Sequence, residues 1–332
     1  MRALPRDVTI SIGVMWTMWN KLLIKTIPSK FVHEIRKFSV SKMAKSRFEY
    51  VKSFEQSDTL LKNCWIVVRV DGKGFHKFCD VHGFDKPNDR RGLNLMSLAA
   101  VNVMLEFNEI VVGYGQSDEY SFVFKRDSTV YERRRDKLVS YVASLFTAAY
   151  IFNWQYIFKD SLPLKYPPAF DARAVLYPTD ENLRDYLSWR QADVHINNLY
   201  NTTFWNLVAS GLTNAEAETR LRKTLSSDKN EILFSEFNIN YNNEPAMYRK
   251  GTVLLRKKVT VADNKSLSLI VPIFDDMIGD KFWQTHPELL DGKAKSNDPF
   301  DIGADIEHVL VQYQIEKHNK RKEGMKRKHE TS

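Results

Sequence analysis

The sequence predicts an α+β fold, in which an antiparallel βαββαβ sheet of the ferredoxin-like type carries helices on one face and a mostly helical C-terminal region follows. An apolar, β-branched run over 64–70 ends in an Asp-Gly pair, as a buried strand does where it closes in a turn. Apolar residues then recur at helical spacing over 89–107. Two strands, 110–114 and 120–124, flank a polar tip and predict a hairpin.

A second helix over 131–153 and a fourth strand over 170–177 complete the βαββαβ unit. The same arrangement forms the palm domains in which two-metal polymerases and nucleotide cyclases carry out their chemistry. Helical patterns then continue until a β-branched run over 251–261, which predicts a hairpin. Because the pattern thins beyond residue 263, we expect residues 285–332 to be loosely packed or disordered.

Four regions follow from these patterns. They are an N-terminal extension at 1–42, a palm catalytic domain at 43–178, a helical region with a terminal hairpin at 179–261, and a weakly structured C-terminal region with a basic tail at 262–332. The formal charge of +8 comes from +6 in residues 1–42 and +4 in residues 316–332, whereas the rest of the chain sums to −2. The core is therefore not a uniformly basic nucleic-acid binder, and contacts with phosphates must come from local clusters.

The chain has two cysteines, Cys64 and Cys79, without zinc-ligand spacing. We therefore expect neither a disulfide framework nor a zinc site.

The N-terminal extension is rich in Arg, Lys and Ser and poor in acids, a composition typical of a mitochondrial presequence. Its apolar stretch, residues 8–19, is shorter than the roughly 20 residues that span a membrane, so we expect no stable membrane association. The same residues fit a dispensable tail before a start at Met43, and that shorter form would be cytoplasmic or nuclear. The basic run at 317–328 fits nuclear targeting, RNA contact or a solvated tail.

Asp71 and Asp118 are the candidate catalytic residues and metal ligands. Each follows an apolar strand, and carboxylates at strand ends can converge above one sheet and hold the Mg²⁺ ions of phosphoryl transfer. An isolated Asp-Gly is often an ordinary turn, but a second acid pair at a separate hairpin tip favours a site. Glu119 is the third acid, and it should point away from Asp118 unless the turn re-aims one of them, because side chains alternate along an extended chain.

The loop from Gly72 to His76 follows Asp71 and offers backbone N–H groups to a triphosphate. His76 either contacts phosphate or base, or is an exposed turn histidine. The basic residues at 133–137 begin the second helix and form either a phosphate contact or a solvated face. A polar cluster in the later helical region fits either nucleotide recognition or satisfied helix polar groups. It consists of His195, Asn197 and Asn198.

Seven short strings match one known family in order and spacing. They are Met43–Val51, Arg69–His76, Lys86–Asp89, Tyr114–Phe122, Asp185–Asp193, His195–Asn201 and Glu231–Glu236. On these strings the chain, from Met43 to about Val261, resembles the eukaryotic tRNA-histidine guanylyltransferases. Each string is short, but together they are specific, and they span about two thirds of the chain.

The resemblance implies an enzyme that adds one guanosine to the 5′ end of tRNA-His, extending the RNA in the 3′-to-5′ direction. ATP would first adenylylate the 5′ monophosphate, the 3′-hydroxyl of GTP would then displace AMP, and pyrophosphate would be removed from the new end. Family members are commonly tetramers whose tRNA spans subunits. We therefore expect a homotetramer that uses tRNA-His, ATP, GTP and Mg²⁺.

The resemblance also assigns roles to residues at matching positions. Two Mg²⁺ would be held by Asp71, the backbone carbonyl of Gly72 and Asp118, with Glu119 as a supporting catalytic residue. The nucleotide triphosphate would be wrapped by Gly72, Lys73, Gly74, Phe75, His76 and Ser117. Triphosphates or the tRNA end would be contacted by Lys86, Asn88, Arg134 and Lys137. tRNA engagement would involve His195, Asn197, Asn198, Arg173 and Arg134.

Two other functions fit parts of the pattern. A palm-domain nucleotide cyclase would use the same metals and form a cyclic product without RNA, but it gives no role to the region around His195. A non-catalytic tRNA-binding scaffold would bind RNA without needing Asp71 or Asp118. The presence of all three acids at the motif positions argues against the scaffold.

Overall fold

The computed structural model describes residues 47–261, 265–291, 299–300 and 308–330. It divides into two units, one ending at Ser57 and the other beginning at Asp58. The described part of the first unit holds the 3-10 helix η1 (Glu49–Phe54). The presequence predicted at 1–42 lies outside the described residues. All other described elements belong to the second unit.

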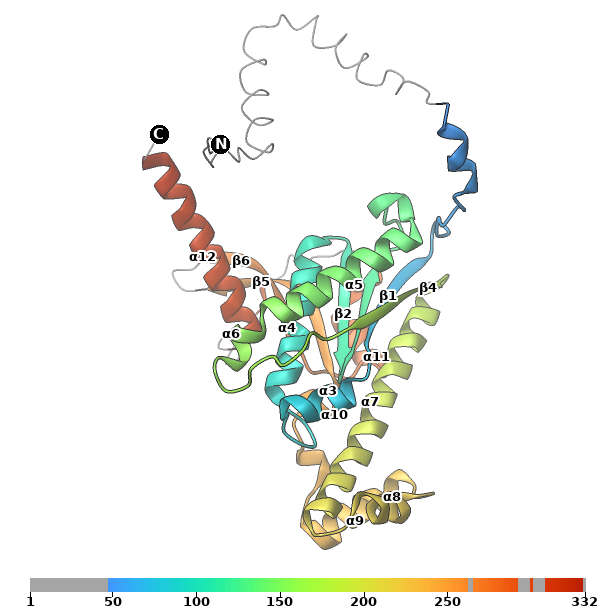
Figure 1. Ribbon diagram of the computed structural model, residues 1–332, viewed down its shortest axis with the longest axis vertical. Helices are drawn as coiled ribbons and strands as arrows, with labels where there is room; N and C mark the ends of the chain where they lie inside the picture. The colour runs from blue at the N-terminus through green and yellow to red at the C-terminus, as the bar shows by residue number, and fades with distance from the viewer. Residues whose placement is uncertain (1–46, 262–264, 292–298, 301–307, 331–332) are drawn as a thin grey trace, which may run out of the picture. The chain divides into compact units, whose positions relative to one another are not determined.

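The described residues of the second unit are arranged around a seven-stranded sheet (Figure 1). Its strands are β1 (Trp65–Gly72), β2 (Ile110–Gln116), β3 (Glu119–Phe124), β4 (Phe170–Tyr177), β5 (Thr252–Val261), β6 (Lys265–Ile273) and β7 (Pro299–Phe300). Six of them lie in the antiparallel order β4-β1-β3-β2-β5-β6, and β7 pairs in parallel with β5. The order β4-β1-β3-β2 is that of a ferredoxin-like βαββαβ unit, so this prediction is confirmed.

Helices α4 (Arg90–Glu106) and α5 (Arg135–Phe152) cover one face of the sheet. Both have apolar residues at helical spacing, and they bury them against inward side chains of β1 and β3 such as Val68 and Phe122. The side chain of Asp89 caps α4 by accepting hydrogen bonds from the first backbone N–H groups of the helix. This cap ends the loop that forms one wall of the site described below.

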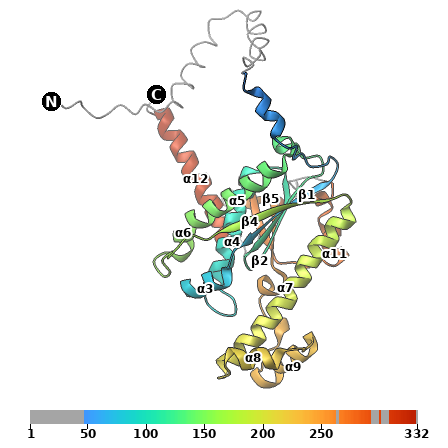
Figure 2. The ribbon, with the colours of Figure 1, turned by 45° about the vertical axis from the view of Figure 1, so that its right-hand side comes forward.

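The long helix α7 (Asp180–Ala209) crosses the other face (Figure 2). Its Tyr186 and Leu187 share a core with Trp65 and Val67 of β1. Alternate residues of β1 thus face different cores, which explains why its sequence is apolar at nearly every position. The α+β class is confirmed, and α7 adds a helical layer on the second face that the sequence did not predict.

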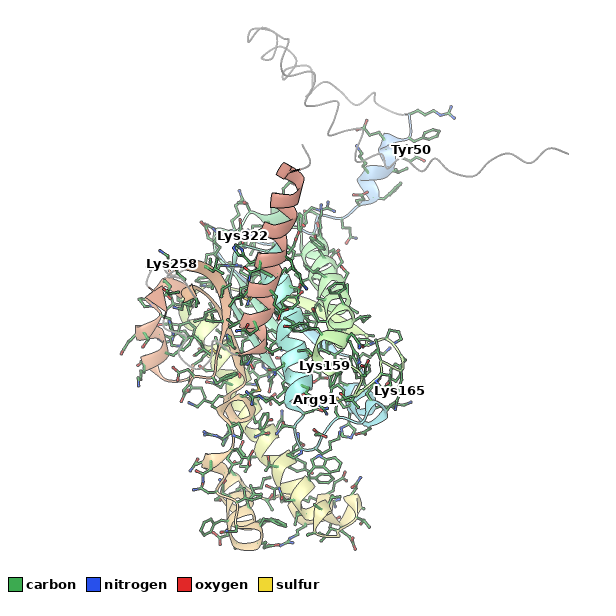
Figure 3. All side chains as sticks on the ribbon, turned by 90° about the vertical axis from the view of Figure 1, so that its left-hand side faces the viewer. Tyr50, Arg91, Lys159, Lys165, Lys258 and Lys322 are labelled. Carbon is green, nitrogen blue, oxygen red and sulfur yellow. The ribbon has the colours of Figure 1, made fainter. Side chains whose placement is uncertain are left out.

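Two predictions for the C-terminal region were wrong. Residues 251–261 do not form a hairpin by themselves, because β5 is one continuous strand between β2 and β6. Part of the region expected to be loose is the helix α12 (Val309–Glu330), which packs on β6 and α4 (Figure 3). The Gln314 side-chain amide donates to the Ile270 carbonyl (2.7 Å) and accepts from the Ile270 N–H (2.9 Å). The helix thereby satisfies backbone groups at the edge of β6.

Shorter helices complete the described unit. They are α3 (Phe75–His82), η2 (Val130–Arg133), α6 (Trp154–Phe158), α8 (Asn214–Leu221), α9 (Ser226–Phe237), η3 (Tyr241–Asn243), α10 (Ala246–Lys250), α11 (Asp280–Thr285) and η5 (Pro287–Leu289). Helices α8 and α9 pack on the end of α7 that points away from the sheet (Figure 1). Among the described helices, none is long and apolar enough to cross a membrane.

Candidate active site

A cleft of about 450 Å³ opens at the end of β1, where the sheet meets α7. Its walls come from the start of α3, the loop before α4, the β2–β3 turn and α7. The predicted site residues that line it are Asp71, Phe75, His76, Lys86, Asn88, Ser117, Asp118, Glu119, Asn197 and Asn198. Small-molecule sites measure roughly 300–1,000 Å³, so the cleft has the size of a nucleotide site.

The two candidate catalytic carboxylates meet at this cleft because the main chain joins their segments. The N–H of Gly72 donates to the carbonyl oxygen of Asp118 in the β2–β3 turn, with 3.0 Å between the nitrogen and the oxygen. Ser117 adopts a left-handed conformation (φ 46°) in that turn. Burial raises the pKa of Asp118, and the negative charge of Asp71 raises it further. Neighbouring carboxylates of this kind are stabilised by a bound cation.

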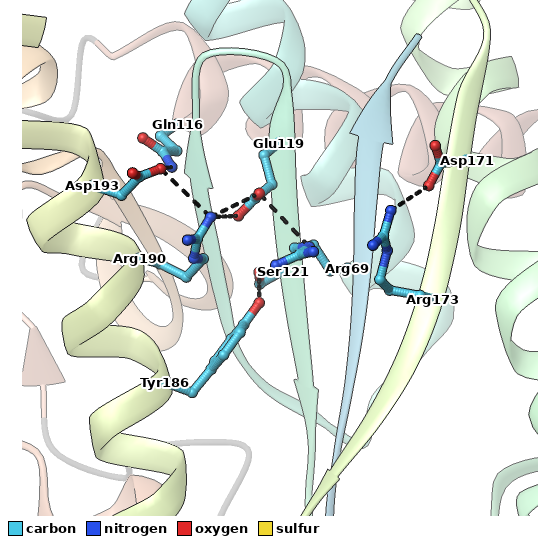
Figure 4. Close-up of polar contacts among 9 residues, drawn as sticks. All are labelled: Arg69, Gln116, Glu119, Ser121, Asp171, Arg173, Tyr186, Arg190 and Asp193. Atoms are coloured by element: carbon cyan, nitrogen blue, oxygen red, sulfur yellow. Dashed lines mark hydrogen bonds and ion pairs between the residues drawn. The ribbon is translucent and has the colours of Figure 1, made fainter. Parts of the chain in front are cut away.

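Glu119 is turned toward α7 and is held by two arginines (Figure 4). Its carboxylate lies 3.2 Å from an Arg190 nitrogen and 3.7 Å from Arg69 Nε. Burial raises the pKa of Glu119, and the positive charges of Arg190 and Arg69 oppose that rise. Asp118 and Glu119 both line the cleft, but from different sides: Asp118 lies near Cys79 and Tyr150, whereas Glu119 faces Arg190 of α7, in keeping with the expected alternation. Asp118 belongs to the turn, and Glu119 begins β3.

The loop after Asp71 has the backbone conformation that its glycines allow. Gly74 caps α3 with a positive φ of 65°. A Cβ on Gly72 would lie 2.3 Å from the ring of Phe75, so only glycine fits there. Lys73 donates its backbone N–H to Ala169 across 2.8 Å, which anchors the loop to the segment before β4.

Two side chains of this loop differ in their surroundings. Phe75 is buried and stacks on Phe78 with the ring centres 4.9 Å apart, so its side chain belongs mainly to the core. His76 is exposed and lies 3.6 Å from Asp80. It remains available at the cleft.

Lys86 and Asn88 stand in the loop before α4. Lys86 Nζ lies 2.7 Å from Asp80 Oδ1 and 5.4 Å from the centre of the Trp205 ring. The Asn88 amide donates to Asn198 Oδ1 (2.9 Å), and the Asn198 amide in turn donates to the hydroxyl of Tyr241 (2.9 Å). Asn198 is buried in this chain of hydrogen bonds, which positions the loop on α7. The structure therefore gives Asn198 a bridging role rather than a surface for RNA.

Several predicted residues are not brought to the cleft wall. Lys137 and Arg134 lie beside the start of β1, where Arg134 pairs with Asp58 (3.4 Å) and Lys137 lies over the Tyr131 ring (4.6 Å). Asp71 lies six residues along β1 from Trp65, the first residue of the strand, and this separation corresponds to about 20 Å. Neither Lys137 nor Arg134 lines the cleft at Asp71, so their contact with triphosphates or the tRNA end stays a prediction.

Two other predicted RNA-binding residues lie outside the cleft wall. Arg173, on β4, pairs with Asp171 (3.4 Å) on the α7 side of the sheet (Figure 4). His195 is exposed beside Tyr241, with 5.5 Å between ring centres. Asn197 is exposed and does line the cleft.

The donor set fits Mg²⁺. Among the described residues no group of three His, Cys, Asp or Glu side chains is placed to hold a metal ion. The cleft instead offers the carboxylates of Asp71 and Asp118. Gly72, whose carbonyl is the third expected ligand, follows Asp71 directly but is not among the residues that line the cleft. Mg²⁺ is commonly bound by one or two carboxylates together with substrate phosphates and water, rather than by an all-protein cage.

Three residues of the site received no role from the sequence: Arg69, Arg190 and Asp193. Arg69 was signalled only as the charged residue that interrupts the apolar run of β1. Arg190 and Asp193 lie one turn apart on α7 and join the site from a helix about 70 residues away in the chain. The matching string Asp185–Asp193 contains both residues, but it does not show their partners, which come from β2 and β3.

A ferredoxin-like sheet that carries paired carboxylates at its strand ends, beside a glycine-containing turn, is typical of nucleotidyl-transfer enzymes. Comparison with known proteins gives the same class. Residues 48–178 match the family model described as tRNAHis guanylyltransferase, and residues 181–331 match the model described as Thg1 C terminal domain. The chain belongs to the tRNA-His guanylyltransferase family and is a nucleotidyltransferase.

Individual relatives are similar over most of their length. The probable tRNA(His) guanylyltransferase of Drosophila melanogaster is 59% identical over 249 residues, which cover 75% of this chain and 86% of that protein. The tRNA(His) guanylyltransferase of Schizosaccharomyces pombe is 54% identical over 259 residues, covering 74% of this chain and 98% of that protein.

Solved structures share the fold. The crystal structure of tRNA(His) guanylyltransferase from Saccharomyces cerevisiae has a TM-score of 0.60 at 47% identity and covers 67% of this chain and 95% of that one. A bacterial tRNA(His) guanylyltransferase-like protein solved in complex with ATP has a TM-score of 0.58 at 21% identity, covering 75% of this chain and 99% of that one.

Proposed function

We propose that this protein adds a guanosine to the 5′ end of tRNA-His. The support comes from relatives that carry this activity in their names and match over at least 86% of their own length. Solved bacterial proteins of similar fold contain ATP in one case and GTP in another. The observation that carries the proposal is the pair formed by Asp71 and Asp118 at the end of the sheet, facing a cleft of nucleotide size.

The proposed reaction has three steps. The 5′ monophosphate of the RNA attacks the α-phosphate of ATP, which releases pyrophosphate and leaves an adenylylated end. The 3′-hydroxyl of GTP then attacks the RNA 5′ phosphate and releases AMP, so the new end carries a triphosphate. Hydrolysis finally removes pyrophosphate from that end.

Asp71, Asp118 and the carbonyl of Gly72 are the groups that would hold two Mg²⁺. These ions would neutralise charge on the triphosphate and lower the pKa of the attacking hydroxyl. The backbone N–H groups of Gly72 and Lys73 already donate to Asp118 and Ala169, so those of Gly74, Phe75 and His76, at the start of α3, would face the phosphates. Lys86 and His76 bring positive charge or hydrogen-bond donors to the same cleft.

The charges of the site support this division of roles. The three acids and a triphosphate together carry about −7, which two Mg²⁺ offset only in part, so nearby cations are needed. Arg69 and Arg190 neutralise Glu119. Asp71 and Asp118 therefore remain as the pair that faces the metal ions.

The expected assembly and location are further parts of the proposal. We propose a homotetramer whose tRNA spans subunits, because Arg134 and Lys137 do not line the cleft of their own chain. The form starting at Met1 is proposed to enter mitochondria, and a form starting at Met43 to remain cytoplasmic or nuclear.

Incubation of the full chain with 5′-monophosphorylated tRNA-His, ATP, GTP and Mg²⁺ tests the function. The RNA should grow by one guanosine, and an Asp118→Ala variant should not extend it. A cyclic nucleotide formed without RNA would point to a cyclase instead. Undiminished tRNA binding without extension in either protein would point to a scaffold.

A further inference from the structure

We propose that Arg190 is a positioning residue: it holds Glu119 against the sheet, so that Asp71 and Asp118 alone face the nucleotide. This inference rests on the proposed function and extends it to a residue of α7. It concerns a side chain that need not touch the substrate.

Arg190 is fixed from three sides. It is only 7% exposed, and Nη1 lies 3.2 Å from Glu119 Oε2 and 3.6 Å from Asp193 Oδ2. Its guanidinium group also lies 3.5 Å from the centre of the Trp189 ring. A planar, permanently charged group held by two carboxylates and an aromatic ring has little freedom to move toward a substrate.

The place of Glu119 explains why it must be held. Glu119 is the direct register partner of Asp71 on the neighbouring strand, and facing residues of an antiparallel pair have Cβ atoms about 4.5–5.5 Å apart. Three carboxylates therefore converge at one end of the sheet. Without Arg190, Glu119 would keep Arg69 at 3.7 Å as its charged partner and would be free to turn toward the metal-binding pair.

Arg190 also links α7 to the turn that carries Asp118. Its partner Asp193 accepts a hydrogen bond from the side-chain amide of Gln116 (3.5 Å) (Figure 4). Gln116 is the last residue of β2, immediately before the Ser117–Asp118 turn. The ion pairs of Arg190 thus join both ends of that turn, Gln116 through Asp193 and Glu119 directly.

The test is a double-mutant cycle with Arg190→Gln, Glu119→Gln and the double variant. The matched control is Arg184→Gln, because Arg184 lies on the same helix, pairs with Asp280 and stands over a tryptophan ring, but away from the cleft. The readouts are kcat and KM for guanosine addition, the Kd of GTP with Mg²⁺, and the midpoint of thermal unfolding. Arg190→Lys keeps the charge and serves if the glutamine variant does not fold.

Arg190→Gln should lower kcat by about 100-fold, because misplacement by about 1 Å costs that much. The KM and Kd of GTP should stay within about twofold, and so should kcat of the Arg184→Gln control. When the chain already carries Glu119→Gln, adding Arg190→Gln should lower kcat by less than about threefold, because the side chain that Arg190 positions is no longer charged.

Two results would overturn the positioning role. A loss from Arg190→Gln that is equally large in the Glu119→Gln background, or that appears in the Kd of GTP, would show that Arg190 acts on the substrate directly. Equal losses from Arg190→Gln and Arg184→Gln, in proportion to lowered unfolding midpoints, would show a role in stability alone. A wild-type protein that does not extend tRNA at all would overturn the proposed function, and this role with it.

Discussion

The backbone N–H of Gly72 donates to the carbonyl oxygen of Asp118 across 3.0 Å, joining the end of β1 to the β2–β3 turn. The meeting of the two acidic segments therefore depends on the main chain and not on either carboxylate. A substitution that removes a carboxylate leaves this hydrogen bond in place. Substitution of either carboxylate can therefore lower the catalytic rate without breaking the backbone contact that holds the two segments together.

Asp118→Asn should lower kcat for guanosine addition by about 1,000-fold or more, equivalent to about 4 kcal/mol of barrier. The midpoint of thermal unfolding should stay the same or rise, because the substitution removes repulsion with Asp71 and keeps the backbone bond. Single-turnover kinetics and calorimetry measure the two effects. A loss of less than about tenfold would count against metal ligation by Asp118.

Arg133 has a structural role that its place in a basic run conceals. It is buried, and its guanidinium group donates to five backbone carbonyls, those of Leu60, Leu61, Cys64, Arg126 and Ser128. Arg133→Met should lower the free energy of unfolding by about 3 kcal/mol, because buried acceptors lose their donors. Denaturant unfolding of the neighbouring, exposed Arg135→Gln variant is the control, with a change within about 0.5 kcal/mol.

A buried cluster in the C-terminal region makes stability depend on pH. His286 Nδ1 lies 3.1 Å from Lys257 Nζ, and Lys257 also pairs with Glu288 (2.7 Å). Burial and the charge of Lys257 lower the pKa of His286 below its ordinary value of 6.5. The unfolded chain therefore binds the proton of His286 more readily than the folded chain does. The contribution of His286 to the free energy of unfolding is present in full above about pH 6.5 and is lost as the pH falls below that value.

The free energy of unfolding of the wild type should therefore fall between pH 7.5 and 5.5, conditions that span the ordinary histidine pKa of about 6.5. In a His286→Gln variant this fall should be smaller, because the residue no longer titrates. Denaturant unfolding at the two pH values measures the difference. The same fall in both proteins would refute a contribution from this cluster.

The position of Lys137 leads to a prediction about assembly. It lies outside the cleft wall, about 20 Å along β1 from Asp71, and we therefore propose that it contacts RNA bound at the catalytic site of another subunit. A mixture of the Lys137→Ala and Asp118→Ala chains, refolded together, should then be more active than either alone. Activity no higher than the sum of the two separate proteins would contradict a shared site.

Much of the site was predictable because its two acids are local features. Asp71 and Asp118 each end an apolar strand, and a βαββαβ unit brings such ends to one edge of the sheet. Arg190 was not predictable in this way, because its partner Glu119 becomes a neighbour only when α7 crosses the sheet. The position of Lys137 outside the cleft wall was not predictable for a related reason: a helix start is visible in the sequence, but the end of the sheet at which it lies is set by topology.

The C-terminal region shows how tertiary contacts override a local pattern. The sequence of α12 is strongly charged and resembles a solvated tail, yet Gln314 bonds to both backbone groups of Ile270 at the edge of β6. The edge strand β6 was not predicted either, because the β-branched run of its pairing partner β5 resembles a complete hairpin. Neither α12 nor β6 has a strong hydrophobic pattern in its own sequence, and the two elements are stabilised by their contact with each other.

We propose that the protein extends RNA at its 5′ end with Asp71 and Asp118 as the metal-binding pair. The most direct measurement uses tRNA-His labelled with ³²P at its 5′ monophosphate, incubated with ATP, GTP and Mg²⁺ and then treated with a pyrophosphatase, which opens the anhydride of an adenylylated end, and with phosphatase. The wild type should make the label resistant to phosphatase, because addition of guanosine converts the terminal phosphate into an internal phosphodiester, and Asp118→Asn should not. A label that remains removable with the wild type, or equal protection by the variant, would contradict the account.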